Sequence, residues 1–193
     1  MKFLWMCAVI ALVACGCAGG RGRSQVDLYD GVKIDELTHN KVSRGIMDRR
    51  TVWLNARREV RRDQTRDYYL VAEFTPSPDF TLQNTGESLV LLIDGVRQGF
   101  SSTNSQHVVK GRPGVVAALY PVAPEVLIQI ANAQDVRMRI KGTTSVIDER
   151  VPAVVQSSLR EWMLRTFTPP ARAAAAGSSA SAGLAAASSA TIR

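Results

Sequence analysis

Apolar and polar residues alternate along much of the middle of the chain, which is the pattern of half-buried β-strands. In residues 51–60, Val52 and Leu54 point to one face of the predicted strand, and the mostly polar residues next to them point to the other. Residues 67–75 are again rich in β-formers and follow a polar turn. Two prolines within residues 75–79 cannot continue a strand ladder. The pattern therefore predicts a long β-hairpin that ends near residue 75.

The strongest turn signal lies in residues 88–100, SLVLLIDGVRQGF. Asp94-Gly95 between apolar residues is typical of a two-residue β-hairpin turn. Residues 89–93 are apolar at every position, so we expect this strand to be buried on both faces and central in its sheet.

Two further strand pairs are predicted. Residues 107–110 and 115–122 flank a Gly-Arg-Pro-Gly turn. Residues 135–141 alternate strictly, with apolar side chains on one face and three cations on the other. Residues 144–149 then pair back against that strand.

Helical spacing of apolar residues appears only late in the chain. One helix is predicted to begin near Pro124, with Leu127, Ile130 and Ala131 as its apolar stripe. A second is predicted after Pro152. Its apolar face is formed by Val155, Leu159, Trp162, Met163 and Phe167. The fold class is therefore α+β, an antiparallel β-rich sheet or sandwich with two helices in the C-terminal half.

Composition divides the chain into four parts. Residues 1–14 are an apolar leader, and residues 15–26 are interpreted as a flexible tether rich in glycine. Residues 27–168 form a single globular α+β domain, which is large enough to bury a core. Residues 169–193 contain mainly alanine and serine, so we expect a disordered tail. All three cysteines precede the domain, which leaves it without disulfides or thiolate metal ligands.

The leader has the organisation of a secretory signal peptide. Lys2 provides a charged start, and Phe3–Ala14 is an apolar run too short to span a bilayer comfortably as a helix. The run ends in Leu-Val-Ala followed by Cys15 and Gly16. This segment resembles the lipobox of bacterial lipoproteins, in which a small residue precedes the cysteine that is lipidated.

The resemblance implies a cellular location for the protein. The Cys15 thiol would carry diacylglycerol and, after processing, three acyl chains, which attach a protein durably to a membrane. Gly16 after the cysteine resembles outer-membrane sorting, which implies a lipid-anchored protein of the bacterial cell envelope facing the periplasm. Cys17 fits the motif less well, because Ala14 would occupy its large aliphatic position. The alternatives are cleavage after Ala18, which would give a secreted soluble periplasmic protein, and an uncleaved anchor.

Candidate chemistry is sparse. The sequence contains none of the common catalytic motifs and only two histidines, His39 and His107, so we expect no metal, no cofactor and no enzymatic activity. An envelope hydrolase with a carboxylate pair is the alternative. The adjacent acids are Asp35 with Glu36 and Asp148 with Glu149, and neighbours on a strand point to opposite faces.

The basic charge gives the second functional expectation. The net charge is +7, and residues 44–66 contain eight arginines. Within them Arg57, Arg58, Arg61 and Arg62 form a candidate anion-binding patch, although a solvated hairpin end has the same composition. We expect a non-enzymatic binding or scaffold module. Its partners would be membrane lipid through Cys15, together with anionic envelope polymers or another envelope protein. Nucleic acid is not expected, because the aromatic residues flank the arginines without alternating with them.

Overall fold

The computed structural model describes residues 20–43, 51–75, 80–83, 85–103, 107–109 and 112–167. The chain divides into two compact units, Met1–Trp162 and Met163–Arg193. The first unit holds every described strand. Cys15, the leader and the Ala/Ser tail lie outside the described residues, so lipidation of Cys15 stays a prediction.

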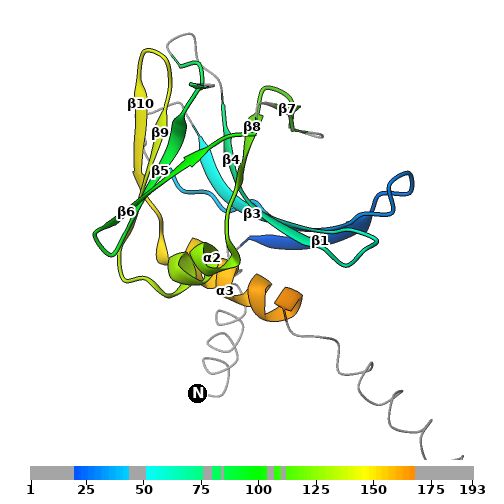
Figure 1. The fold of residues 1–193 in the computed structure, drawn as a ribbon. Coiled ribbons are helices and arrows are strands. Elements are labelled where there is room, and N and C mark those ends of the chain that lie inside the picture. The colour runs from blue at the N-terminus through cyan, green and yellow to red at the C-terminus, as the bar shows by residue number, and fades with distance from the viewer. Residues whose placement is uncertain are drawn as a thin grey trace, which may run out of the picture. The chain divides into compact units, whose positions relative to one another are not determined.

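The described strands form two antiparallel sheets (Figure 1). The six-stranded sheet has the order β1-β2-β3-β4-β8-β7, and the four-stranded sheet has the order β10-β9-β5-β6. The helices come late, and the α+β prediction is confirmed. The elements are β1 (Arg21–Val26), β2 (Lys33–Thr38), β3 (Val52–Val60), β4 (Arg66–Phe74), β5 (Glu87–Ile93), β6 (Val96–Ser101), β7 (His107–Val108), β8 (Val116–Pro121), α2 (Pro124–Asn132), β9 (Val136–Lys141), β10 (Val146–Arg150) and α3 (Ala153–Phe167).

Local sequence signals explain the hairpins. β3 and β4 pair along their whole length, from Val52 opposite Phe74 to Val60 opposite Arg66. The β5–β6 turn has positive φ at both central residues, 47° at Asp94 and 85° at Gly95, as a tight hairpin with right-handed twist requires. The predicted hairpin of β7 and β8 and the pairing of β9 with β10 are also confirmed.

The core lies where the inward faces of the two sheets meet. Leu54 and Leu70 of the six-stranded sheet are buried, as are Leu91 and Met138 of the four-stranded sheet. The Ser88 hydroxyl on β5 donates to the Tyr120 hydroxyl on β8 at 3.2 Å, which links the two sheets. Burial raises the pKa of Tyr120 to about 12.

Both helices contribute apolar faces to the core. Leu127, Ile130 and Ala131 of α2 are fully buried, as predicted. On α3, the Gln156 side-chain amide donates to the carbonyl oxygens of Ile130 and Ala133 at 3.1 and 3.0 Å. These bonds satisfy carbonyls at the C-terminal end of α2, where no helical partner is present.

The structure differs from the prediction for β5. The strand is internal, between β9 and β6, as expected. Its second face is not buried, since Leu92 is 37% exposed and Val90 is half-buried. Their neighbours on that face are arginines of β6 and β9. Long side chains of this kind flank apolar residues with their aliphatic stems while the charge stays in water.

A second difference concerns the start of the domain. Residues 21–26, assigned from composition to the flexible tether, form β1 and pair with β2 in full register, from Arg21 opposite Thr38 to Val26 opposite Lys33. All side chains of β1 are exposed, so its backbone pairing leaves no apolar signal in the sequence. β2 was not predicted either, because Asp35 occupies one of its inward positions.

Candidate functional site

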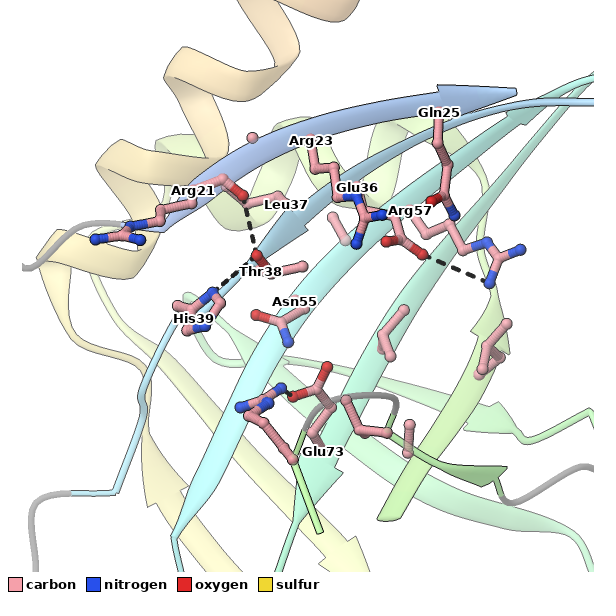
Figure 2. A pocket seen from close by; sticks show the side chains of 17 residues that line it. Arg21, Arg23, Gln25, Glu36, Leu37, Thr38, His39, Asn55, Arg57 and Glu73 are labelled. Atoms are coloured by element: carbon pink, nitrogen blue, oxygen red, sulfur yellow. Dashed lines mark hydrogen bonds and ion pairs between the residues drawn. The ribbon is translucent and has the colours of Figure 1, made fainter. Parts of the chain in front are cut away.

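The six-stranded sheet carries a hollow of about 740 Å³ on the face opposite the core (Figure 2). We call it the sheet hollow. Side chains from five strands and from the segment before β8 line it. Its polar lining consists of Arg21, Arg23, Gln25, Glu36, Thr38, His39, Asn55, Arg57, Glu73 and Arg112.

One wall of the sheet hollow is β1. Arg21, Arg23 and Gln25 follow one another at alternate positions and all line the hollow (Figure 2). The register places Arg23 opposite Glu36, yet the ion pair of Glu36 is with Arg57, at 3.6 Å. Within the described part of the chain, neither Arg21 nor Arg23 forms an ion pair. Arg21 and Arg23 therefore line the hollow without an ion-pair partner among the residues that the structure describes.

The opposite wall contains a half-buried arginine. Arg112 stacks over the Trp53 ring, 4.6 Å from its centroid, and forms an ion pair with Glu73. A cation over an indole face is attracted by the ring quadrupole. Burial lowers the pKa of Arg112 without displacing it from the charged form at neutral pH. Arg112 therefore has its partners within the fold.

A donor on the floor of the sheet hollow lacks a partner. Asn55 is 3% exposed and lies between His39 and Glu73 (Figure 2). Its Oδ1 accepts the backbone N–H of Asn40 at 3.1 Å, which fixes the orientation of the amide. Its Nδ2 has no hydrogen-bond partner among the residues that the structure describes. A buried donor left unsatisfied costs about 1–3 kcal/mol, and an acceptor bound in the hollow would remove that cost.

His39 lies at the end of the hollow near Arg21. Its backbone is left-handed, with φ 68°, and its Nδ1 is 2.9 Å from the Thr38 hydroxyl. That hydroxyl donates to the Arg21 carbonyl at 3.1 Å, so Nδ1 is the protonated nitrogen of the neutral ring. Burial lowers the pKa of His39, and the charges of Arg112 and Arg21 lower it further. His39 is therefore neutral at pH 7.

The charge balance of the sheet hollow is positive. Four arginines line it against two glutamates, an excess of two positive charges. Arg57 is 2.7 Å from Glu59 in addition to its contact with Glu36. The excess is therefore located on Arg21 and Arg23. Guanidinium groups and an unsatisfied amide donor that line one hollow form a site suited to carboxylate, phosphate or sulfate.

The structure separates the four arginines that the sequence indicated. Arg57 lines the sheet hollow, whereas Arg58 follows it on β3 and points to the other face. Arg58 is 7% exposed and binds Asp35, with Nη2 to Oδ2 at 2.7 Å. Arg61 pairs with Asp67 at 2.8 Å, and Arg62 donates to the Tyr29 carbonyl at 3.4 Å. These four side chains do not share one surface.

The adjacent carboxylates do not converge either. Asp35 lies opposite Arg58 and Glu36 opposite Arg57, on the two faces of β2. Asp148 is held by Arg139 through two bonds of 2.6 and 2.8 Å, while Glu149 lies opposite Met138 in the strand register. The residues that the structure describes include no group of three His, Cys, Asp or Glu that could hold a metal ion. The side chain of His107 lies outside the described residues.

Sequence reasoning missed Asn55 and Arg112 as site residues, and it assigned Arg21 and Arg23 to the flexible tether as cations near the lipid headgroups, whereas they lie on β1. A signal for Arg21 and Arg23 is present in RGRSQV, where two arginines and a glutamine occupy alternate positions. Arg112 belongs to a predicted turn, and only the pairing of β8 with β4 brings it to Trp53 and Glu73.

Comparisons with known proteins give no relative for this chain: no family model, no curated protein and no solved structure matches it. Of the helices that the structure describes, neither is long and apolar enough to cross a membrane.

Proposed function

We propose that this protein is a lipid-anchored protein of the bacterial envelope that acts as a non-enzymatic binding module, with the sheet hollow as its binding site for an anionic ligand. The observation that carries the binding site is that Arg21 and Arg23, which form no ion pair among the described residues, line the same hollow as the unsatisfied amide of Asn55. The lipobox-like segment before Cys15 supports the anchor.

Binding is tested with poly-L-glutamate, an anionic polymer, by calorimetry in about 50 mM salt, where charges are weakly screened. A hydrogen bond to a charged group contributes roughly 1.5–3 kcal/mol, so the double variant Arg21→Ala/Arg23→Ala is expected to bind at least about tenfold more weakly. Arg62→Ala/Arg66→Ala removes the same charge from exposed positions outside the hollow and is expected to change the affinity less than about twofold. Equal weakening in both variants would refute the site.

The anchor is tested by growing cells with an alkyne fatty acid. The parent protein and a Cys17→Ser variant are expected to incorporate the label, and Cys15→Ser is expected to lose it. Label retained in Cys15→Ser would overturn lipidation at Cys15. The sheet hollow would then stand as the binding site of a protein that is not anchored through Cys15.

A further inference from the structure

The sheet hollow is open along one strand edge. β1 is the outermost strand of the six-stranded sheet, and β2 is its one partner among the described strands. Every residue of β1 is exposed. The outer edge of such a strand presents backbone N–H and C=O groups that another extended segment can pair with.

The cations of β1 are spaced for an extended partner. Side chains at alternate positions of a strand lie on one face, about 6.6 Å apart. A strand paired with β1 would therefore place every second side chain beside Arg21, Arg23 and Gln25, on the face that forms the hollow. Side chains directly opposite in paired strands interact, and opposite charges stabilise the pair. Carboxylates at alternate positions of the incoming segment match this spacing.

The charges distinguish β1 from the edge strand β10 of the other sheet. On β10, Asp148 already binds Arg139, and Arg150 is 2.7 Å from Asp135. An acidic segment there would compete with carboxylates of the fold. At β1, Arg21 and Arg23 have no such partner among the described residues.

The ends of this chain do not supply the acidic segment. Residues 1–19 and residues 168–193 contain no aspartate or glutamate. Residues 44–50 contain one aspartate and three arginines. These three stretches therefore do not supply the alternating carboxylates, and the occupant considered for β1 is a segment of a partner protein.

We propose that β1 binds an extended acidic segment of a partner protein by β-strand addition, with carboxylates at alternate positions set against Arg21 and Arg23. This inference rests on the proposed function of the sheet hollow as an anion site and names its ligand class. The affinity then has two sources: charge, which Arg21 and Arg23 supply, and backbone pairing along β1.

The test uses the full-length protein in detergent and three synthetic peptides of about eight residues, enough to cover β1. The first alternates threonine and glutamate, the second has the same composition with its glutamates in one block, and the third is the alternating peptide with every second amide N-methylated. Fluorescence anisotropy is expected to show about tenfold tighter binding of the alternating peptide than of the block peptide. N-methylation is expected to remove that advantage, because a methylated amide cannot donate to a strand. The alternating peptide is also expected to lose affinity for Arg21→Ala/Arg23→Ala.

Other outcomes separate the two proposals. Equal binding of all three peptides, lost in Arg21→Ala/Arg23→Ala, would overturn strand addition and leave the sheet hollow as an anion site. Tight binding of dextran sulfate without binding of any peptide would overturn the proposal of a peptide ligand and favour an anionic glycan. Equal binding of every probe to the parent and to Arg21→Ala/Arg23→Ala would overturn both the anion site and the inference.

Discussion

Two arginine-rich surfaces of this protein differ in one respect, the carboxylates beside them. On the outer face of the four-stranded sheet, each of four arginines forms an ion pair; we call this the paired-arginine face. These residues are Arg97 with Glu87, Arg137 and Arg150 with Asp135, and Arg139 with Asp148. In the sheet hollow, Arg21 and Arg23 have no such partner among the described residues. A count of arginines does not distinguish these surfaces, whereas their pairing does.

Strand register explains the difference. Asp148 lies directly opposite Arg139 on neighbouring strands, so Arg139 has its counter-ion within the sheet. Glu36 lies opposite Arg23 in the same way, but its ion pair is with Arg57 on the next strand. Glu36 therefore forms its ion pair across β2 and β3, and Arg23 forms none among the described residues. The strand β3 lies on the other side of β2 from β1 and supplies Arg57, the partner of Glu36, so the positive charge of Arg23 remains in the hollow.

The largest expected effect separates a buried pair from an exposed one. Asp35→Ala leaves the buried Arg58 guanidinium without its carboxylate, and breaking a buried pair costs about 3–5 kcal/mol. Asp148→Ala removes an exposed partner of Arg139, and because solvent screens this pair the loss of stability is expected to be far smaller. Urea unfolding measures both. Equal losses would show that the burial of Asp35 and Arg58 has no energetic consequence.

The second expected effect is on acid stability. Burial raises the pKa of Asp35, but hydrogen bonds from Arg58 and Ser24 and the nearby charges outweigh it, so the pKa is lowered. The folded state therefore holds the proton less tightly than the unfolded state, and this contribution to stability is present above the unfolded pKa and is lost as pH falls through the folded value. We expect the free energy of unfolding of Asp35→Asn to vary less with pH in this acidic range than that of the parent. An unchanged slope would contradict the assignment to Asp35.

The smallest expected effect concerns His39 and distinguishes the hollow from the paired-arginine face. Its pKa is lowered by burial and by the charges of Arg112 and Arg21, and a bound anion opposes the effect of those charges. The complex then binds a proton more tightly than the free protein, so affinity increases by a few-fold as pH falls below the usual histidine value. Calorimetry with dextran sulfate, whose charge is constant in this range, measures the increase.

The control for this experiment is His39→Asn, because asparagine tolerates the left-handed backbone at this position. This variant is expected to bind with little dependence on pH. The same increase in the variant and the parent would place the titrating group elsewhere.

Much of the fold follows from local sequence. The alternation in residues 51–60 and the Asp94-Gly95 turn were sufficient for two hairpins, because each pairs segments that are close in the chain. β1 could not be found from apolar periodicity, since only its backbone is engaged. β2 was missed because Asp35 at an inward position depends on Arg58, more than twenty residues away.

The site was less predictable than the fold. Successive side chains on a strand point to opposite faces, so Arg57 and Arg58 cannot share one face. The sequence alone was therefore enough to separate these two members of the proposed anion-binding patch. Which arginine lacks a carboxylate could not be predicted, since it depends on the order β1-β2-β3 across the sheet. Long-range pairing therefore determines the site.

The most direct measurement titrates inorganic phosphate into the isotope-labelled protein and follows side-chain NMR signals. We expect shifts of the Asn55 amide, the His39 ring and the Arg21 and Arg23 guanidinium groups, with the Arg139 signal unchanged. Shifts on Arg139 and its neighbours on the paired-arginine face, with those of the sheet hollow unmoved, would contradict the claim that an unpaired arginine marks the anion site.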